Sequence, residues 1–243
     1  MAVLRPVLRV QLREHNEMVQ FQQNCATVSR PELQEDKEME KFQQNYAVVL
    51  RQETKRKPVR VLRHALAAFG AAALLFGLYL GGLQLTGNFH EVLPGVLYRS
   101  AQPSPADIDK YAARYGIKTI LNLRGENTGR WYTQETEAAK KAGITHIDYG
   151  LSASTEVTAE QAHELLTLLR NAPKPILIHC QAGADRTGLV SVLYLQQIAG
   201  LDEETAERQL SVRYGHIGIP YLSAAFAMDE SWEKLEKIFG IDS

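Results

Sequence analysis

Residues 176–188, ILIHCQAGADRTG, decide the fold expected for this chain of 243 residues. Ile176, Leu177 and Ile178 follow two prolines and form an apolar, mostly β-branched run, which predicts a short buried strand. A helix-periodic run begins near Thr187. The stretch is therefore expected to fold as a strand, a tight loop and a helix, with one cysteine and one arginine in the loop.

The loop has the residues that chemistry on a phosphate ester needs. Its small residues let the backbone turn so that successive N–H groups point inward, and the N-terminus of the following helix adds positive potential. These groups and the guanidinium of Arg186 favour the thiolate of Cys180, which predicts a nucleophile. Arg186 can hold two phosphoryl oxygens, and the hydroxyl of Thr187 can donate to the sulfur when it leaves. The predicted phosphate-binding residues are Gln181, Ala182, Gly183, Ala184, Asp185 and Arg186.

Three side chains of this stretch have competing interpretations. A lone cysteine is most often an inert buried residue, but that interpretation explains neither Arg186 nor the glycines around Cys180. His179 either supports the thiolate by hydrogen bonding or packs at the end of the strand. Asp185 either orders Arg186 or a water molecule, or is an exposed loop carboxylate. The residues alone leave the roles of His179 and Asp185 open.

The pattern from His179 to Gly188, H-C-x-x-G-x-x-R-T-G, resembles the signature loop of the cysteine-dependent protein tyrosine and dual-specificity phosphatases. LYRSAQP (97–103), TILNLRGE (119–126) and RYGHIGIP (213–220) are similar to small bacterial, often exported, members of that family. The resemblance covers roughly residues 88–239. It implies hydrolysis of phosphate monoesters (phosphotyrosine, with phosphoserine or phosphothreonine) through a phosphocysteine, without a metal or a cofactor.

The resemblance also implies a general acid, usually an aspartate, on a movable loop before the nucleophile. The corresponding residues 149–160, YGLSASTEVTAE, contain no aspartate. Glu156 is the first choice for the acid, Asp148 the second and Glu126 the third, and each has a surface carboxylate as its alternative. Arg124 is expected either to add positive charge to the rim of the site or to form an ion pair that orders a loop.

Strand and helix patterns alternate from residue 96 to residue 239. The expected strands are 96–98, 118–123, 145–149 and 176–178, and the expected helices are 105–115, 133–142, 159–171, 187–199, 202–213 and 223–239. Such alternation predicts an α/β domain over residues 88–243, with a central, mostly parallel sheet flanked by helices. Its ligand is expected at the carboxyl ends of the strands, where Cys180 lies.

Residues 65–85 carry no charge and are expected to form one transmembrane helix before the domain. A helix of this length measures about 31 Å, close to the hydrocarbon core of a bilayer. Lysines and arginines cluster at 55–63, and none follows until Arg99, which predicts a single-pass inner-membrane protein with its domain on the periplasmic side. If translation started near Val49, the same segment would be a signal sequence, but it lacks a clear A-x-A site, so an uncleaved anchor is preferred.

The first 64 residues form a basic tail with 12 Lys and Arg against 8 Asp and Glu. Residues 12–30 and 33–51 repeat each other at an offset of 21 residues. The repeat indicates either a partner-seeking or flexible tail, or duplicated DNA upstream of a later start. Cys25 and Cys180 lie on different segments, which excludes a disulfide framework, and a net charge of −1 gives no indication of nucleic-acid binding.

The expected partners are therefore a phosphorylated protein or a small phosphate ester, and the membrane through residues 65–85. Two alternatives keep the same loop: an inositol phosphate phosphatase, and a phosphate-binding pseudoenzyme that lost its acid. The inositol enzymes resemble C-K-x-G-K in the loop, whereas Gln181 and Ala184 stand where those lysines would be. A third alternative makes the tail and the membrane helix the functional part of the chain.

Overall fold

The structure, a computed structural model, describes residues 35–241. The first copy of the repeat (12–30) and Cys25 lie outside these residues. The chain divides into two compact units, one ending at Ala71 and the other beginning at Ala72.

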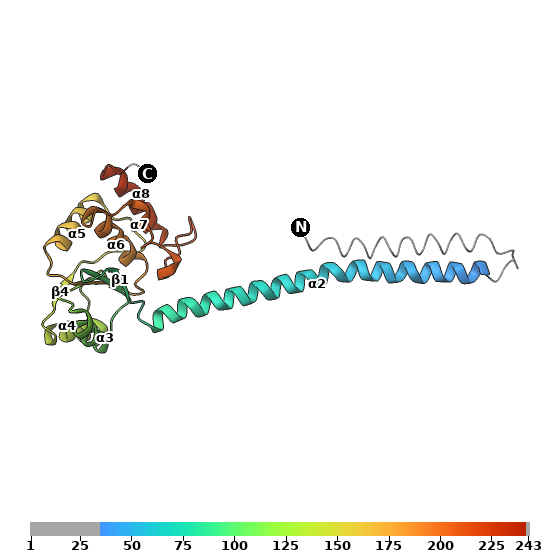
Figure 1. The fold of residues 1–243 in the computed structure, drawn as a ribbon, viewed down its shortest axis with the longest axis horizontal. Coiled ribbons are helices and arrows are strands. Elements are labelled where there is room, and N and C mark those ends of the chain that lie inside the picture. Colours follow the sequence, from blue (N-terminus) through green and yellow to red (C-terminus); the bar gives the residue numbers. More distant parts are fainter. Residues whose placement is uncertain (1–34, 242–243) are drawn as a thin grey trace. The chain divides into compact units, whose positions relative to one another are not determined.

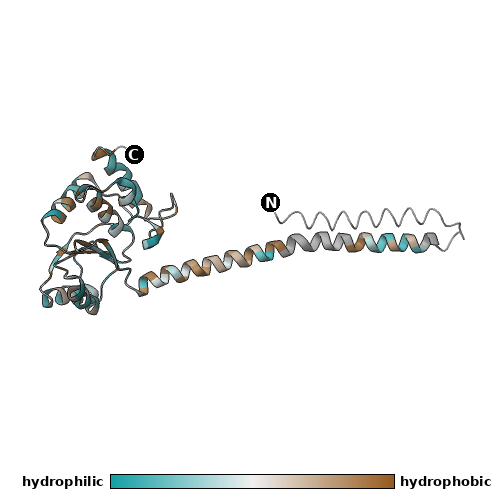
Figure 2. Ribbon diagram, in the orientation of Figure 1, coloured by the Kyte–Doolittle hydropathy of each residue, from teal (hydrophilic) through white to brown (hydrophobic). Residues whose placement is uncertain are grey.

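Helix α2 (Glu35–Leu85) contains the predicted membrane segment and begins well before it. Within it, Val61–Leu85 is long and apolar enough to cross a bilayer by length and composition (Figure 2), and its most apolar window of 18 residues has no buried residue. A core helix of a water-soluble domain would be mostly buried. The helix ends where Gly87 and Asn88 take positive φ angles of 75° and 45°, which an α-helix cannot continue.

The second unit contains one five-stranded sheet. Its strands are β1 (His90–Leu93), β2 (Leu97–Ser100), β3 (Thr119–Asn122), β4 (Thr145–Asp148) and β5 (Ile176–His179). They lie in the order β1-β2-β5-β3-β4, and only β1 is antiparallel to its neighbour. The predicted α/β fold with a mostly parallel sheet is confirmed.

Strand β1 was not predicted, because residues 86–94 have the composition of a linker. The tight turn that joins it to β2 contains Gly95 at φ +72° and is closed by a bond from the amide of Val96 to the carbonyl of Leu93 (3.0 Å). The Pro94–Gly95 pair is the local signal for this turn, since proline and glycine suit its two central positions.

Helices cover both faces of the sheet (Figure 1). They are α3 (Pro105–Tyr115), α4 (Arg130–Lys141), α5 (Ala159–Asn171), α6 (Asp185–Gln197), α7 (Glu203–Glu207), a 3-10 turn (Val212–Tyr214) and α8 (Phe226–Ile238). The capping box formed by Thr158 and Gln161 at the start of α5 is confirmed.

The expected helix 202–213 is wrong, since α7 stops at Glu207. Two tertiary contacts interrupt it. The carbonyl of Gln209 accepts a hydrogen bond from the buried Arg99 (2.8 Å), and residues 209–210 lie against Gly188 of α6, where a Cβ would stand 2.8 Å from Leu210 Cδ2. Neither contact can be read from the local pattern of the helix.

The core has two parts, one on each face of the sheet. Ile176 and Ile178 of β5 pack toward α5, α6 and α8, while Leu177 packs toward α3 and α4. The register aligns Ser100, His179, Asn122 and Asp148 at the carboxyl ends of the four parallel strands. Cys180 follows directly beyond this edge, so the sheet presents the signature loop (residues 179–188) there.

Candidate active site

Gly183 fixes the course of the signature loop. Its φ is +70°, in the left-handed region that glycine adopts without strain. A Cβ at this position would stand 2.5 Å from the amide nitrogen of Ala101 and 2.7 Å from the carbonyl oxygen of Ser100. The loop is thus packed directly against the backbone that leaves β2, and only glycine fits.

The carbonyl groups of the loop are bound from outside it. Arg99 Nη2 donates to the carbonyls of Gly183 (2.8 Å) and Ala184 (3.1 Å), and the amide of Gln102 donates to that of Gln181 (3.2 Å). The carbonyl of Ala182 accepts from Asn88 Nδ2 (2.9 Å) and from Gln84 Nε2 (3.3 Å) at the end of α2. Because the N–H of a trans peptide points opposite to its C=O, the N–H groups of residues 182–185 face the interior of the loop.

Arg99 is the central residue among those that bind the loop from outside, and no role was predicted for it beyond its place in LYRSAQP. It is fully buried, its Nη1 donates to the carbonyl and the side-chain oxygen of Gln209 (2.8 Å each), and its guanidinium carbon lies 4.0 Å from the centre of the Tyr214 ring. Burial lowers the pKa of Arg99 to about 10, against opposing effects of Tyr214, Cys180 and Asp185. The guanidinium therefore stays cationic at neutral pH, beside the loop that holds Cys180.

Unsatisfied donors gather at the loop. Among the described residues, buried side-chain atoms without a hydrogen-bond partner are Arg99 Nε, His179 Nδ1, Arg186 Nε and Thr187 Oγ1. Arg186 is partly held, because its Nη1 donates to the carbonyls of Leu123 (3.2 Å) and Leu151 (3.1 Å). Buried donors without a partner are rare in folded proteins, and an oxyanion bound in the loop is an acceptor that would satisfy the Nε of Arg186.

His179 is tied to a buried carboxylate that the sequence did not reveal. Its Nε2 and that of His146 share Oε1 of Glu135, at 2.7 Å and 2.8 Å, while Gln102 Nε2 donates to Oε2. Burial would raise the pKa of Glu135, but the hydrogen bonds from the two histidines and Gln102 lower it to about 2. The ionised carboxylate thus holds the ring of His179 in one orientation through its Nε2, one residue before Cys180.

Arg124 belongs to the same network. Its Nη1 donates to Gln102 Oε1 (2.7 Å), and its guanidinium carbon lies 3.6 Å from the centre of the Trp131 ring. Burial and the charge of Arg186 lower the pKa of Arg124, while Glu135 and Cys180 raise it. Arg124 therefore adds a second positive charge near Arg186, held by Gln102 and Trp131 in place of the ion pair that was the alternative.

The three carboxylates predicted as acids lie in different settings. Both oxygens of Asp148 accept hydrogen bonds, from Asn122 Nδ2 (2.7 Å) and from the hydroxyl of Tyr132 (2.6 Å). Glu156 accepts from Lys234 of α8. Glu126 is exposed after β3. Within residues 35–241, no hydrogen bond joins any of the three to the signature loop.

Asp185 is bound by a histidine that the sequence did not connect with it. Its Oδ1 accepts from Nδ1 of His216 (2.8 Å), whose Nε2 lies 3.0 Å from Oδ2 of Asp229 on α8. Burial lowers the pKa of His216, but the hydrogen bonds with both aspartates raise it to about 9. A charged imidazole therefore joins the first turn of α6 to α8 at neutral pH.

Comparison with known families agrees with this geometry. Residues 79–210, more than half of the chain, match the sequence model of the tyrosine phosphatase family. The chain belongs to the tyrosine phosphatase family. The family predicted from the signature loop is thereby confirmed, and the chain is a hydrolase.

Two curated relatives of this phosphatase differ in substrate. It is 25% identical over 173 residues to the dual specificity protein phosphatase TpbA of Pseudomonas aeruginosa, covering 64% of this chain and 73% of TpbA. It is 36% identical over 107 residues to the inositol diphosphatase SIW14 of Saccharomyces cerevisiae, covering 42% of this chain and 36% of SIW14. Among solved structures, that of P. aeruginosa TpbA aligns with a TM-score of 0.44 at 24% identity, over 65% of this chain and 86% of that one.

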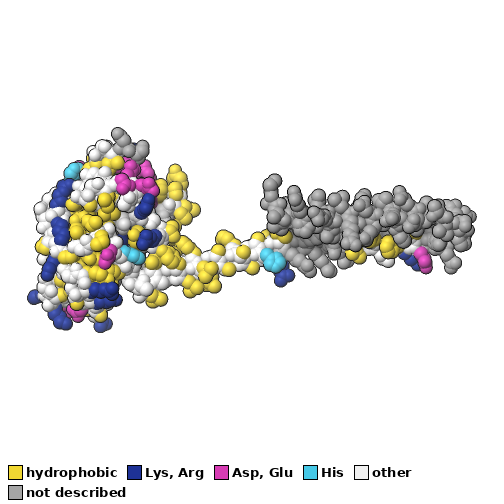
Figure 3. Space-filling view, viewed as in Figure 1, with side chains coloured by type: hydrophobic (Ala, Val, Ile, Leu, Met, Phe, Trp, Pro, Cys, Tyr) yellow, Lys and Arg dark blue, Asp and Glu magenta, His cyan; other side chains and the backbone are white. Residues whose placement is uncertain are grey.

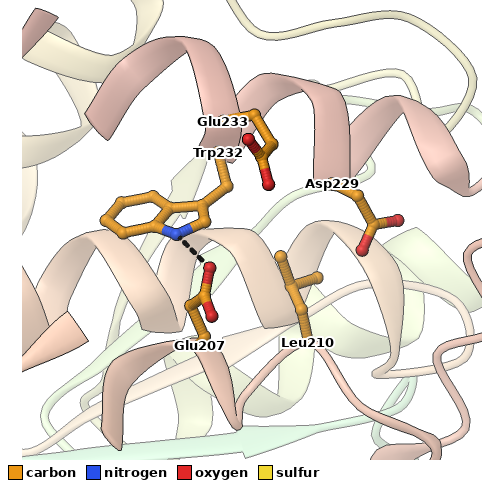
Figure 4. A pocket seen from close by; sticks show the side chains of 5 residues that line it. All are labelled: Glu207, Leu210, Asp229, Trp232 and Glu233. Carbon is orange, nitrogen blue, oxygen red and sulfur yellow. Dashed lines mark hydrogen bonds between the residues drawn. The ribbon is translucent and has the colours of Figure 1, made fainter. Parts of the chain in front are cut away.

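One cavity of the phosphatase lies away from the signature loop, between α7 and α8 (Figure 4). Its lining is Glu207, Leu210, Asp229, Trp232 and Glu233, and the indole N–H of Trp232 donates to Glu207 (2.8 Å). The carboxylates of Glu207, Asp229 and Glu233 line a cavity of about 140 Å³, and their negative charge would repel a phosphate group. Nearby, oxygens of Glu203, Glu207 and Glu236 lie within 4.8 Å of one another, but burial and a hydrogen bond with Glu203 raise the pKa of Glu236, as expected for carboxyls that share a proton.

Proposed function

We propose that this phosphatase hydrolyses phosphate monoesters with Cys180 as its nucleophile, and that phosphotyrosine, with phosphoserine or phosphothreonine, is its substrate class. The main support is the signature loop. Its carbonyls are bound from outside, while the Nε of Arg186 and the hydroxyl of Thr187 are buried donors without a partner. A phosphoryl group bound over Cys180 would accept from the loop N–H groups and from Arg186. The name of TpbA, a dual specificity protein phosphatase, supports the substrate class.

In this mechanism the thiolate of Cys180 attacks phosphorus, and the bond from phosphorus to the leaving oxygen breaks. Arg186 and the inward N–H groups of the loop stabilise the charge on the transferred phosphoryl oxygens. A water molecule then attacks the phosphocysteine, and the P–S bond breaks to release inorganic phosphate. The hydroxyl of Thr187 donates to the departing sulfur, which leaves as the thiolate.

The leaving oxygen takes its proton from a general acid, which we assign to Glu156. Glu156 lines a cavity of about 310 Å³ together with Leu151, and the carbonyl of Leu151 accepts a hydrogen bond from Arg186. Its contact with Lys234 is a surface ion pair, and such pairs contribute only about 0–1 kcal/mol, so the carboxylate is free to exchange partners. Asp148 is the second choice, because both of its oxygens already accept hydrogen bonds.

The first test is metal-free hydrolysis of p-nitrophenyl phosphate by the full-length chain. Cys180→Ser should abolish turnover, while Cys25→Ser, the matched change at the other cysteine, should not. Glu156→Gln should slow phenyl phosphate, which has the poorer leaving group, more than p-nitrophenyl phosphate, and should remove the alkaline decline of kcat. Activity of Cys180→Ser equal to the parent would refute the nucleophile, and an unchanged pH profile in Glu156→Gln would transfer the acid role to Asp148.

The similarity to SIW14 supports a second candidate, a phosphatase for inositol diphosphates. Gln181 and Ala184 weaken it, because lysines at these positions would neutralise the extra phosphates of such a substrate. Rates on a diphosphoinositol polyphosphate and on a phosphotyrosine peptide, measured on the same preparation, distinguish the two. A kcat/KM higher for the inositol compound would reverse the assignment.

We further propose that the chain is a single-pass inner-membrane protein with its catalytic domain on the periplasmic side. The support is the exposed apolar helix Val61–Leu85 and the basic residues at its amino-terminal end, which are Lys55, Arg56, Lys57 and Arg60 before it and Arg63 in its first turn. Carboxyl-terminal fusions to alkaline phosphatase and to green fluorescent protein test the orientation. An active alkaline phosphatase fusion and a dark fluorescent fusion are expected, and the opposite pattern would refute the orientation.

A further inference from the structure

Four exposed residues, Ile219, Pro220, Tyr221 and Leu222, form a turn between the 3-10 segment and α8. We name it the apolar turn. The amide of Leu222 donates to the carbonyl of Ile219 (3.1 Å), and the amide of Ser223 donates to the same oxygen (2.9 Å). Tyr221 is fully exposed and Leu222 is 83% exposed. The backbone thus holds large apolar side chains outward, where water is an unfavourable neighbour.

Tyr221 also has a φ of +63°, a conformation that costs a residue with a side chain about 1 kcal/mol or more. Strained and exposed apolar residues together are uncommon in a surface turn, and they indicate a contact surface. In Figure 1 this orange segment protrudes from the domain on the side from which the last turns of α2 approach it, and Figure 3 shows hydrophobic side chains gathered there.

The end of α2 is packed against the residues just before the apolar turn. The hydroxyl of Tyr79 donates to the carbonyl of Arg213 (2.7 Å). A Cβ at Gly215 would stand 3.4 Å from Leu83 and 3.9 Å from Leu80, so both leucines lie against residue 215. The last two turns of α2 are therefore bound to the domain, a few residues from the apolar turn in sequence.

These contacts fix where a membrane would begin. If residues 79–85 lie against the domain, residues 61–78 remain to cross the bilayer and measure about 27 Å, and Arg63 and His64, in the first turn of this segment, extend to the headgroups of the opposite leaflet. Tyr79 then lies at the level of the lipid headgroups, where tyrosine is enriched. Arg213, which is exposed beside it, would meet the negative charge of anionic lipids.

We propose that the apolar turn inserts into the surface of an anionic phospholipid bilayer, as a second membrane contact beside α2. The proposal rests on the membrane anchoring proposed above, and it holds for any substrate of the phosphatase. Tyrosine and leucine suit the boundary between headgroups and acyl chains, because each has an apolar body and the phenol keeps a polar end for the headgroups. The domain would thereby be held in one orientation over the lipid.

Tryptophan fluorescence in vesicles of phosphatidylethanolamine and phosphatidylglycerol with brominated acyl chains tests the proposal. The full-length chain is used with Leu222→Trp, with Tyr221→Trp, and with Ile238→Trp as the matched control, since Ile238 is an exposed apolar residue of α8. The emission of the parent, which contains two tryptophans, is subtracted. Hydrolysis of p-nitrophenyl phosphate equal to the parent's verifies that each variant is folded.

The expected result is blue-shifted emission from residues 221 and 222 that bromine quenches, with no quenching at residue 238. Equal quenching at all three positions, or none in a chain that floats with the vesicles, would overturn the proposal. A blue shift that grows with protein density and resists bromine would place a second copy of the chain on the turn, and would also overturn it. A chain that fails to float would refute the membrane anchoring itself, which separates that failure from failure of the turn.

Discussion

Replacing Arg99 by methionine should damage the signature loop without touching the substrate. The guanidinium makes four hydrogen bonds, to the carbonyls of Gly183 and Ala184 and to two oxygens of Gln209. Hydrogen bonds to a charged group contribute roughly 1.5–3 kcal/mol each, and they are not additive. Removing one partner of such a buried network costs about 3–5 kcal/mol.

A loss of this size is a large part of the free energy of unfolding of a domain, which is about 5–15 kcal/mol. Thermal unfolding of the catalytic domain in the full-length Arg99→Met variant should therefore shift down by about 10 °C. Released carbonyls of Gly183 and Ala184 would also let their peptides turn, so the loop would lose N–H groups that face the oxyanion. If this weakens oxyanion binding by about 1.4 kcal/mol, the Kd for orthovanadate rises tenfold.

The assays are thermal unfolding by near-ultraviolet circular dichroism and vanadate inhibition of turnover. Arg114→Met is the matched control, because Arg114 is exposed in the last turn of α3, and a change there should stay within about 0.5 kcal/mol. Arg99→Lys should be intermediate, since one ammonium group cannot span the loop and Gln209 together. An Arg99→Met protein that unfolds earlier but binds vanadate as the parent does would show that Arg99 only packs the core, and would refute the argument.

Three other changes have defined outcomes. Gly183→Ala should abolish vanadate binding, whereas Gly143→Ala, also at positive φ but with no atom within 4 Å of its Cβ, should cost only about 1 kcal/mol and leave turnover intact; inhibition assays on both variants check this. The pKa of His216 is raised to about 9, so the stability that its charged form contributes is complete below the unfolded pKa of about 6.5 and is lost as pH rises through 9. The Tm of the parent should therefore fall between pH 6.5 and 9, and thermal unfolding of His216→Gln should show a smaller fall over the same range. The lowered pKa of Glu135, about 2, gives a contribution that is present above about 4.5 and lost as pH falls through 2, so Glu135→Gln should lower Tm and kcat at neutral pH more than Glu137→Gln does.

The parts predicted correctly from the sequence are those whose signal is local. The strand, loop and helix around Cys180 follow from a continuous run of residues, and the cap at Thr158 follows from two residues in neighbouring turns. The start of α6 was placed two residues late, at Thr187 in place of Asp185, because the helix begins inside the loop.

The parts that were missed depend on contacts between distant segments. Glu135 lies 44 residues from His179 in sequence, and Arg99 lies 84 residues from Gly183. Glu135 is one of two acids in α4, and nothing in the local sequence distinguishes it from the exposed Glu137 as the one that is buried between two histidines. His216 is likewise one histidine between glycines and isoleucines until the fold places Asp185 and Asp229 on its two nitrogens. Proximity of this kind arises only from the topology of the sheet and the packing of α8.

The hydrogen bonds from Gln84 and Asn88 to the carbonyl of Ala182 hold the signature loop at a fixed distance from the end of α2. A domain on a flexible linker can sweep a hemisphere whose radius grows with the square root of the linker length. Here Gln84 of the last turn of α2 and Asn88 just after it bind the loop directly, so, if α2 crosses a membrane as we propose, the active site stays within a thin layer above the bilayer. A phosphate group on a distant part of a tall protein stays out of range, while one that diffuses along the surface meets the enzyme in two dimensions at a raised effective concentration. The distance of a phosphate group from the membrane surface would then decide whether it can reach the active site, before any selection by the residues of the pocket.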